Sequence, residues 1–374
     1  MKAACDRATL TRGVQVASTV VAPKSPKPVL GCVKMEAQGG RMTLLATDLE
    51  VGIRIEMDKI DVQEEGAGLV PAERFHSILR ELDADTVSVA STQTETKVTA
   101  PGAHFTILGD NPEDFPAVPQ FPETGAFSVA ADDLLALAER TLFSTAKENT
   151  RYALNGVLWE VEGNNLNLVA TDGRRLSLAR GKCKDGPKEK VSAIVPSKAM
   201  HLIERCLTDM AKADGNVRVV LGEKDILLEA PPSDGGRRIV YSRLVDGHFP
   251  KYDDVIPKDF DKKATLKTAD FLTAVRRAAL LTNEESRGVM MKFAGTELVI
   301  TSRTPEMGEA EVRMAVEEYE GEPLEIGFNP VYLMDAAKVI DAESFVFKFK
   351  GSSKPGVMEE ARLFTHVIMP VSIV

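Results

Sequence analysis

The chain has 374 residues and a formal net charge of −10, with 44% hydrophobic and 6% aromatic residues. A single hydrophobic core seldom holds so many residues, so we expect two or three domains with largely aliphatic cores. The acidic balance argues against tight nucleic-acid binding over a broad surface, since such binders carry an excess of Lys and Arg. It leaves room for weak, local contact with DNA.

The N-terminus and the cysteines argue against a secreted or membrane-inserted protein. Charges at Asp6, Arg7 and Arg12 stand where a signal peptide needs an apolar run, and no run of about 18 apolar residues occurs. Four cysteines lack CxxC spacing, which predicts reduced core thiols rather than a metal site or disulfides; they are Cys5, Cys32, Cys183 and Cys206. We therefore expect a cytoplasmic protein that has no membrane partner.

In chain order, six segments carry apolar residues at the spacing of an amphipathic helix. They cover residues 6–21, 75–82, 132–145, 200–207, 268–281 and 333–340. The second, fourth and sixth segments follow Pro71, Pro196 and Pro330. We expect each proline at the start of its helix, where its missing N–H costs nothing.

A short string recurs between these segments. Ala46-Thr47-Asp48 returns as Ala170-Thr171-Asp172, and residues 298–303 form a degraded third copy. Residues of alternating polarity flank the copies, so we expect each copy to form the turn of a β-hairpin.

The repeated order of these features predicts three copies of one α+β unit, each with two helices packed on β-sheets. Proline-rich connectors at residues 111–122 and 249–257 separate the copies. We place the domains at residues 1–125, 126–259 and 260–374. Any single repeated feature could arise by chance, but the recurrence of several features in one order favours true repetition.

The motifs of several enzyme classes are absent from the sequence. It contains no GxxxxGK[ST], no GxGxxG opening a helix, no HExxH and no GxSxG. Asp48 and Asp172 are the best catalytic pair, which would suit a hydrolase or transferase. An Asp at such a turn more often caps the turn through its own side chain. A sequence-specific DNA-binding regulator is a third reading, which would need a recognition helix that reads bases.

Five segments together resemble the β sliding clamps of bacterial DNA polymerase III, in order and over the whole chain. They are TRYALNGV (150–157), VATDGRRL (169–176), LVDGHFPKY (244–252), EIGFNPVYL (325–333) and VIMPV (367–371). The resemblance implies the DNA-clamp fold, in which three similar domains form a crescent and two crescents close head to tail into a homodimeric ring. It implies that double-stranded DNA passes through the ring regardless of sequence, and that the ring tethers polymerases for processive synthesis. It implies a clamp loader that uses ATP, and no catalytic site, cofactor or metal.

The resemblance also implies a hydrophobic pocket between the second and third domains that receives a short peptide from polymerases and other partners. Its residues would combine an adaptable apolar wall with a few polar groups. They are Leu154, Thr171, Gly173, Arg174, Arg175, Leu176, Pro250, Val255, Asn329, Tyr332, Val367, Met369, Pro370 and Val371.

Positive charge should line the hole of such a ring, because Lys and Arg contact phosphates without reading sequence. The candidates are Lys24, Lys27, Arg74, Arg80, Lys147, Arg151, Lys198, Arg205, Arg276 and Lys338. For any one of them, a solvated surface charge is an equally good interpretation.

The resemblance places the dimer joint at an edge strand that contains Phe105 and Ile107, and at Leu280 and Leu281 of the other subunit. An unpaired strand edge invites such pairing. Glu306, Glu309 and Glu311 could add ionic contacts there, although a solvated face is the simpler interpretation.

The sequence departs from the family pattern in two places. Asp253 and Asp254 stand where the family commonly has basic residues beside the pocket, and the chain ends in Ser372-Ile373-Val374 instead of a basic and a final apolar residue. Both changes make the pocket rim less positive, so we expect a shifted preference among peptides.

Overall fold

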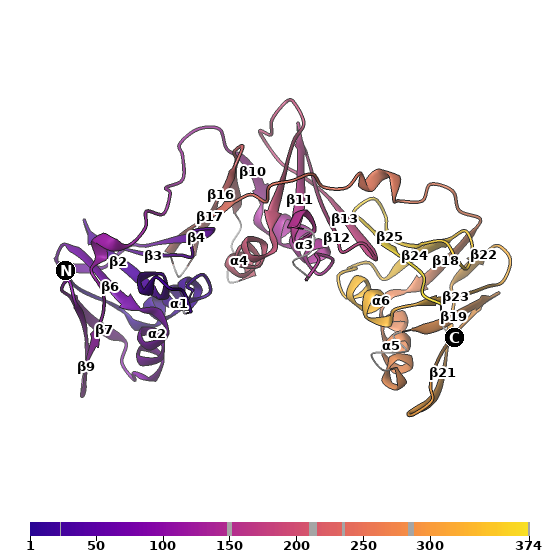
Figure 1. Ribbon diagram of the computed structural model, residues 1–374, viewed down its shortest axis with the longest axis horizontal. Helices are drawn as coiled ribbons and strands as arrows, with labels where there is room; N and C mark the ends of the chain where they lie inside the picture. Colours follow the sequence, from indigo (N-terminus) through magenta and orange to yellow (C-terminus); the bar gives the residue numbers. More distant parts are fainter. Residues whose placement is uncertain (23, 148–151, 209–214, 234–235, 283–287, 373–374) are drawn as a thin grey trace. The chain divides into compact units, whose positions relative to one another are not determined.

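The computed structural model describes residues 1–22, 24–147, 152–208, 215–233, 236–282 and 288–372 (Figure 1). The chain divides into two compact units by its internal contacts. The first comprises residues 1–135, 183–188 and 198–244, and the second comprises residues 136–182, 189–197 and 245–374. The middle third of the chain therefore contributes to both units. No helix in the described ranges is long and apolar enough to cross a membrane.

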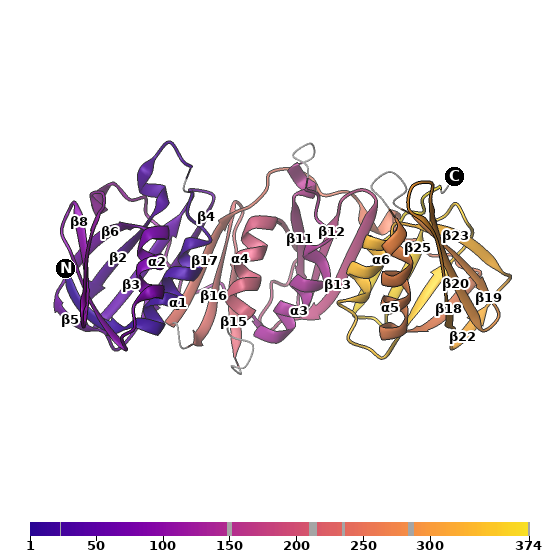
Figure 2. The same ribbon diagram turned by 90° about the horizontal axis from the view of Figure 1, so that it is seen from below.

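The first unit contains two antiparallel sheets, of strand order β5-β1-β7-β8-β9 and β10-β15-β16-β17-β4-β3-β2-β6. The strands of the first sheet are β1 (Lys2–Asp6), β5 (Asp61–Glu64), β7 (Thr86–Ser91), β8 (Glu95–Ala100) and β9 (Ala103–Leu108). Those of the second are β2 (Cys32–Gln38), β3 (Arg41–Thr47), β4 (Val51–Met57), β6 (Gly66–Pro71), β10 (Phe127–Ala130), β15 (Asn216–Leu221), β16 (Asp225–Ser233) and β17 (Gly236–Arg243). Helices α1 (Arg7–Ser18) and α2 (Ala72–Glu81) lie side by side on this unit (Figure 2).

The second unit also contains two antiparallel sheets, of strand order β14-β11-β12-β13-β26-β25-β24-β18-β22 and β21-β20-β19-β23. The strands of the first are β11 (Gly156–Glu162), β12 (Asn165–Thr171), β13 (Arg175–Lys182), β14 (Val191–Pro196), β18 (Lys262–Lys267), β22 (Glu318–Glu320), β24 (Ser344–Phe349), β25 (Gly356–Glu360) and β26 (Phe364–Ile368). Those of the second are β19 (Val289–Ala294), β20 (Glu297–Thr304), β21 (Gly308–Ala315) and β23 (Leu324–Phe328). Helices α5 (Thr268–Ala278) and α6 (Pro330–Ala337) pack side by side (Figure 2).

The six predicted helices all form, with α3 (Ala131–Leu142) and α4 (Ser197–Thr208) completing the set. Asp6 caps α1 by accepting a hydrogen bond from the Thr9 amide at 2.7 Å, which satisfies one of the free N–H groups of the first turn. Each of the three prolines lies at the start of its helix, as predicted. Pro330 is the first residue of α6, Pro71 is the N-cap residue of α2, and Pro196 directly precedes α4. Pro71 and Pro196 are also the last residues of β6 and β14.

Two hairpin turns share one hydrogen-bond pattern, which explains the repeated Ala-Thr-Asp string. In each, the Thr hydroxyl donates a hydrogen bond to the carbonyl four residues ahead and accepts one from the amide two residues ahead. The Asp Oδ1 accepts the amides two and three residues ahead. The distances are 2.9, 3.0, 2.9 and 2.7 Å for Thr47 and Asp48, and 2.7, 3.1, 2.9 and 3.0 Å for Thr171 and Asp172. The predicted capping role of the two aspartates is therefore confirmed.

The third copy of the string does not form a turn, so that prediction was wrong. Thr301 and Ser302 lie inside β20, and the chain turns only after Thr304. Ser302 replaces the aspartate, and its hydroxyl donates to the Ala278 carbonyl at 2.7 Å instead of accepting turn amides. Without a carboxylate to hold the amides, the strand continues.

The two large sheets are each built from two copies of the repeat. The strand that follows the Ala-Thr-Asp turn of one copy pairs with the last strand of the next copy, as β4 does with β17 and β13 does with β26. The corresponding strands β21 and β9 each end a sheet, and no other described strand pairs with their outer side.

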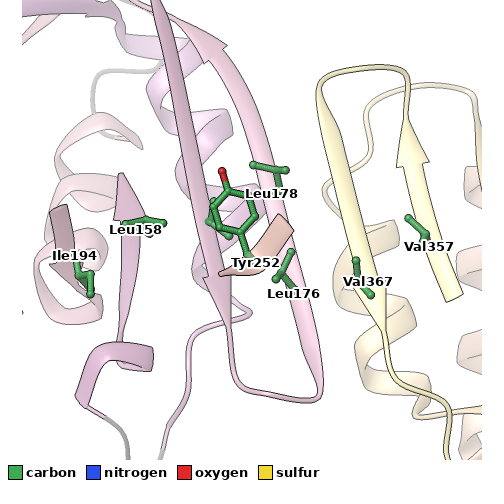
Figure 3. Close-up of a cluster of buried hydrophobic side chains, with 8 residues drawn as sticks. Leu158, Leu176, Leu178, Ile194, Tyr252, Val357 and Val367 are labelled. Atoms are coloured by element: carbon green, nitrogen blue, oxygen red, sulfur yellow. The ribbon is translucent and has the colours of Figure 1, made fainter. Parts of the chain in front are cut away.

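The connectors between copies cover the outer faces of these sheets. Phe115 and Val118 pack on a cluster that includes Leu45 and Leu69. Tyr252 of the next connector packs on a cluster formed by Leu158, Val169, Leu176, Leu178, Ile194, Val357 and Val367 (Figure 3). In the third copy, the sheet β21-β20-β19-β23 carries an open hollow of about 340 Å³, whose lining includes the charged residues Lys292, Glu311, Arg313 and Glu325.

Candidate functional site

A hollow of about 190 Å³ opens in the second unit beside the β12–β13 turn. It is lined by Leu154, Thr171, Gly173, Arg174, Arg175, Leu176, Pro250, Tyr252, Val255, Val367 and Met369. The structure thus brings together ten of the fourteen pocket residues predicted from the sequence. Most of the wall is aliphatic, and Val255 and Met369 are 46% and 42% exposed. Exposed apolar side chains inside a concave wall favour the binding of an apolar ligand group.

The floor of the hollow is a sheet junction. Leu176 of β13 and Val367 of β26 are cross-strand neighbours, and both belong to the buried cluster of Figure 3. Tyr252 lies against β13 beside Leu176 and Leu178 (Figure 3). Two of the pocket's walls therefore come from strands that the chain order separates by nearly 200 residues, and the third comes from the connector.

Arg175 forms a rigid part of the wall because its guanidinium is held from several sides. It donates to Asp172 Oδ2 at 3.1 Å, to Asp335 Oδ2 at 2.8 Å and to the Phe143 carbonyl at 2.5 Å. Its Cζ atom also lies 5.3 Å from the Phe143 ring centroid and 4.4 Å from that of Tyr332. Paired, stacked guanidinium groups tolerate burial well, and only 6% of this side chain is exposed.

Four predicted residues do not line the hollow. Asn329 caps α6, with Oδ1 accepting the Val331 amide at 2.9 Å, and Tyr332 stacks against Arg175. Pro370 and Val371 follow Met369, and the Val371 amide donates to the Gly327 carbonyl. Asn329 and Tyr332 belong to the start of α6, and Pro370 and Val371 lie beyond the end of β26. Ile373 and Val374 of the altered C-terminus lie outside the described residues.

Tyr252 is the lining residue that the sequence prediction missed. Its hydroxyl donates to Glu160 Oε2 at 2.5 Å, and burial, together with this hydrogen bond, raises the pKa of the hydroxyl. The available signal was its place at the end of the connector motif LVDGHFPKY, between the proposed pocket residues Pro250 and Val255. A tyrosine there can supply both apolar area and an anchored polar end.

A buried polar chain runs beneath the pocket floor. Ser144 Oγ lies 2.8 Å from Ser177 Oγ, which lies 2.8 Å from His366 Nδ1. Burial lowers the pKa of His366 to about 3, and the nearby Arg175 guanidinium adds to the decrease. His366 is therefore neutral at neutral pH, which suits its position beside the apolar Val367.

Three family models cover nearly the whole chain. The N-terminal, central and C-terminal domains of the DNA polymerase III beta subunit match residues 1–119, 128–251 and 253–372. The chain belongs to the DNA polymerase III beta subunit family. Among its relatives, the beta sliding clamp of Pseudomonas aeruginosa is 34% identical over 370 residues, covering 98% of each chain. That of Chlamydia muridarum is 30% identical over 374 residues, covering 100% of this chain and 99% of the relative.

Solved sliding clamps share the fold of this chain. A Bacillus subtilis sliding clamp superposes with a TM-score of 0.92 at 26% identity, covering 100% of both chains. A Pseudomonas aeruginosa clamp bound to griselimycin gives 0.91 at 34% identity, covering 100% of this chain and 99% of that one. The chain thus has the three-domain clamp fold of a DNA polymerase III sliding clamp.

The family assignment and the geometry argue against the two alternative functions, a hydrolase or transferase and a sequence-specific DNA-binding regulator. Sliding clamps are processivity factors and not enzymes. Asp48 and Asp172, which we considered as a catalytic pair, each use Oδ1 to hold a turn. Their other oxygens pair with Lys198 and Arg175, respectively.

The predicted DNA-facing cations are exposed wherever the structure describes them. Arg74 and Arg80 lie on α2, Lys198 and Arg205 on α4, Arg276 on α5 and Lys338 at the end of α6; Lys147 follows α3, and Lys24 and Lys27 follow α1. Arg151 lies outside the described residues. Among the described residues, Arg80 pairs with Glu81, Lys198 with Asp48 and Lys338 with Asp335. Part of their charge is therefore compensated within the chain.

The predicted dimer residues divide between surface and core. Phe105 and Leu280 are 38% and 70% exposed, and Leu281 is half-buried. Ile107 is only 5% exposed, so its side chain lies in the core of its own unit, and its part in a dimer joint stays a prediction. The neighbouring Leu108 is 72% exposed and is the stronger candidate, because successive strand residues point to opposite faces.

Proposed function

We propose that two copies of this chain close head to tail into a ring that encircles double-stranded DNA. The internal joints of the chain carry this proposal. The eight-stranded sheet joins β6-β2-β3-β4 to β17-β16-β15-β10, and the nine-stranded sheet joins β14-β11-β12-β13 to β26-β25-β24-β18-β22. In both joints, the strand after an Ala-Thr-Asp turn pairs with the last strand of the next repeat. The same pairing between two chains would place β21 of one chain beside β9 of the other. It would join the sheet β23-β19-β20-β21 to the sheet β9-β8-β7-β1-β5.

The side chains at these two edges support the pairing. Leu108 ends β9, while Met307 precedes β21 and is 49% exposed. Leu280 belongs to the 3-10 turn η5 (Ala279–Leu281), which contacts β21. An exposed strand edge beside large apolar side chains is an unfavourable surface for an isolated chain, and pairing would cover it.

We place DNA against the helices, where exposed cations supply sequence-independent phosphate contacts. If all twelve helices of a dimer, each about 10 Å across, line the ring, the hole measures roughly 28 Å. That width admits a duplex and water, so topology rather than tight contact retains the ring. This arrangement accounts for the function of an acidic protein on DNA. We keep the domain boundaries at residues 1–125, 126–259 and 260–374 as part of this proposal.

The hollow beneath Tyr252 and Val255 is, in this proposal, where polymerases and other partners insert a short peptide with apolar anchors. Its mixed aliphatic and polar wall supports that role. A clamp loader that uses ATP would open the ring, and the protein would act in the cytoplasm.

Retention on circular against linear DNA tests the ring directly. Nicked circles would be loaded with a compatible clamp loader and ATP, half would be cut once, and both halves would be passed through gel filtration in moderate salt. Retention on circles with loss from linear DNA supports topological binding. Equal retention on both, or binding to neither, would contradict the proposal.

A further inference from the structure

The mouth of the pocket carries negative charge at one place. The 3-10 turn η4 (Tyr252–Asp254) is followed by Val255, and both Tyr252 and Val255 line the hollow. Asp253 and Asp254 stand between them in the chain, and both are exposed. Within the described residues, neither carboxylate has a side-chain partner in a hydrogen bond or ion pair.

Two observations tie this charge to the pocket. Val255 and Met369 present exposed apolar surface in the hollow, and Asp254 directly precedes Val255 in the chain. The Asp253 carboxylate also adds, after burial and the Glu160 hydrogen bond, to the rise in the pKa of the Tyr252 hydroxyl. Asp253 is therefore close to Tyr252, a residue of the wall.

The opposite charge lies on a different segment. Two of the lining residues are cations, Arg174 and Arg175. Arg175 is buried and paired with Asp172 and Asp335, so its charge is compensated. Arg174 is exposed on the β12–β13 turn. The rim therefore has a positive charge at the turn, whereas η4 carries two carboxylates with one exposed cation, Lys251, before them.

We propose that this pocket selects peptides that carry basic residues on the flank that crosses η4. The inference rests on the proposed role of the hollow as a peptide site, and it names the class of peptide. Lys or Arg beside the apolar anchors would pair with Asp253 and Asp254, whereas acidic flanks would meet like charge. Because these carboxylates are solvated, the preference should be modest and should weaken with salt.

Synthetic peptides with one set of apolar anchors, two leucines and a phenylalanine, test the proposal. One series carries two lysines, two glutamates or two serines before the anchors, and a second series carries them after. Fluorescence anisotropy would give each Kd at an ionic strength of about 0.1 M and about 1 M, where the Debye length is about 10 Å and about 3 Å. We expect lysines at one end to tighten binding by about two- to tenfold over glutamates at low salt, and the difference to shrink at high salt.

The double variant Asp253→Lys/Asp254→Lys should reverse the preference at that end and leave the serine peptide unaffected, which shows that the pocket remains folded. The variant Glu317→Lys/Glu318→Lys is a matched control, because it changes two adjacent exposed carboxylates that do not line the hollow. It should retain the preference of the wild type.

The outcomes distinguish a failure of the charge selection from a failure of the peptide site. Equal binding of lysine and glutamate peptides, the same preference at both ends, or a preference that survives the Asp253/Asp254 variant would overturn the charge selection while the peptide site stands. Failure of every peptide to bind would overturn the proposed peptide site itself.

Discussion

Arg175 on β13 and Asp335 on α6 form a hydrogen-bonded ion pair at 2.8 Å, and this pair fixes the position of a wall of the pocket. The guanidinium is nearly buried, whereas the carboxylate is 22% exposed. The arginine therefore depends on its partners more than the aspartate does, since an unpaired buried charge is costly.

Replacing this carboxylate should weaken both the fold and the pocket. We expect Asp335→Asn to destabilise the second unit by about 1–3 kcal/mol, because a buried donor loses its charged acceptor. Peptide affinity should fall with it, since Arg175 lines the hollow. Urea unfolding and fluorescence anisotropy would measure the two effects.

Lys338→Ala provides the control for that change, because it removes the other cation that pairs with Asp335, at 3.4 Å, and leaves Arg175 in place. It should cost less than about 0.5 kcal/mol. If the two variants behaved alike, the wall would not depend on Arg175.

Asp48 should act as a turn residue whose effect is local. Its burial alone would raise its pKa, but hydrogen bonds from Lys198 and from the Val51 and Glu50 amides outweigh this and lower the pKa below its usual value. A lowered pKa in the folded state means that the stabilisation is present above about pH 4 and is lost as the pH falls through the folded value.

We expect Asp48→Ala to speed hydrogen exchange of the Glu50 and Val51 amides. The free energy of opening of this turn should fall by about 1–2 kcal/mol. Asp48→Asn keeps an acceptor for these amides and should change their exchange much less. Mass spectrometry of the peptide that spans residues 44–54 would follow both. Unchanged exchange in the alanine variant would contradict the capping role.

The edges of β9 and β21 should control assembly. Leu108→Asp combined with Leu280→Asp places charge at both exposed edges, and we expect the chain to sediment as a monomer and to be lost from circular DNA. Leu363→Asp is the matched control, since Leu363 is 49% exposed at the turn between β25 and β26. A double variant that still sediments as a dimer would show that the joint lies elsewhere.

Buried His366 should make the protein sensitive to acid. Its folded pKa of about 3 lies below the ordinary value of about 6.5, so the unfolded chain binds the additional proton between these values. Stability should therefore fall as the pH decreases from about 6.5 to 3. His366→Gln should flatten this part of the dependence of the unfolding midpoint on pH, whereas His201→Gln, at an exposed site, should not. Identical slopes for wild type and His366→Gln would refute the assignment.

The sequence by itself determined the features that depend on neighbouring residues. Helical spacing predicted all six helices. The Ala-Thr-Asp string predicted three turns, of which two formed, because its threonine and aspartate bond backbone groups only two to four residues away. In the degraded third copy, Ser302 stands in place of the aspartate, and this part of the chain stays in β20. The motif pattern predicted ten of the pocket's eleven lining residues through its resemblance to a family.

Only the tertiary structure decided which side chains face the hollow, the core or the solvent. Ile107 and Leu108 are adjacent and similarly apolar, yet one is buried and the other exposed, since the packing of the sheet determines which side of β9 is covered. Tyr252 reaches the pocket because its connector crosses the outer face of β13. The pairing of β13 with β26 brings Leu176 beside Val367, and no local pattern encodes that contact, because its register depends on residues far apart in the chain.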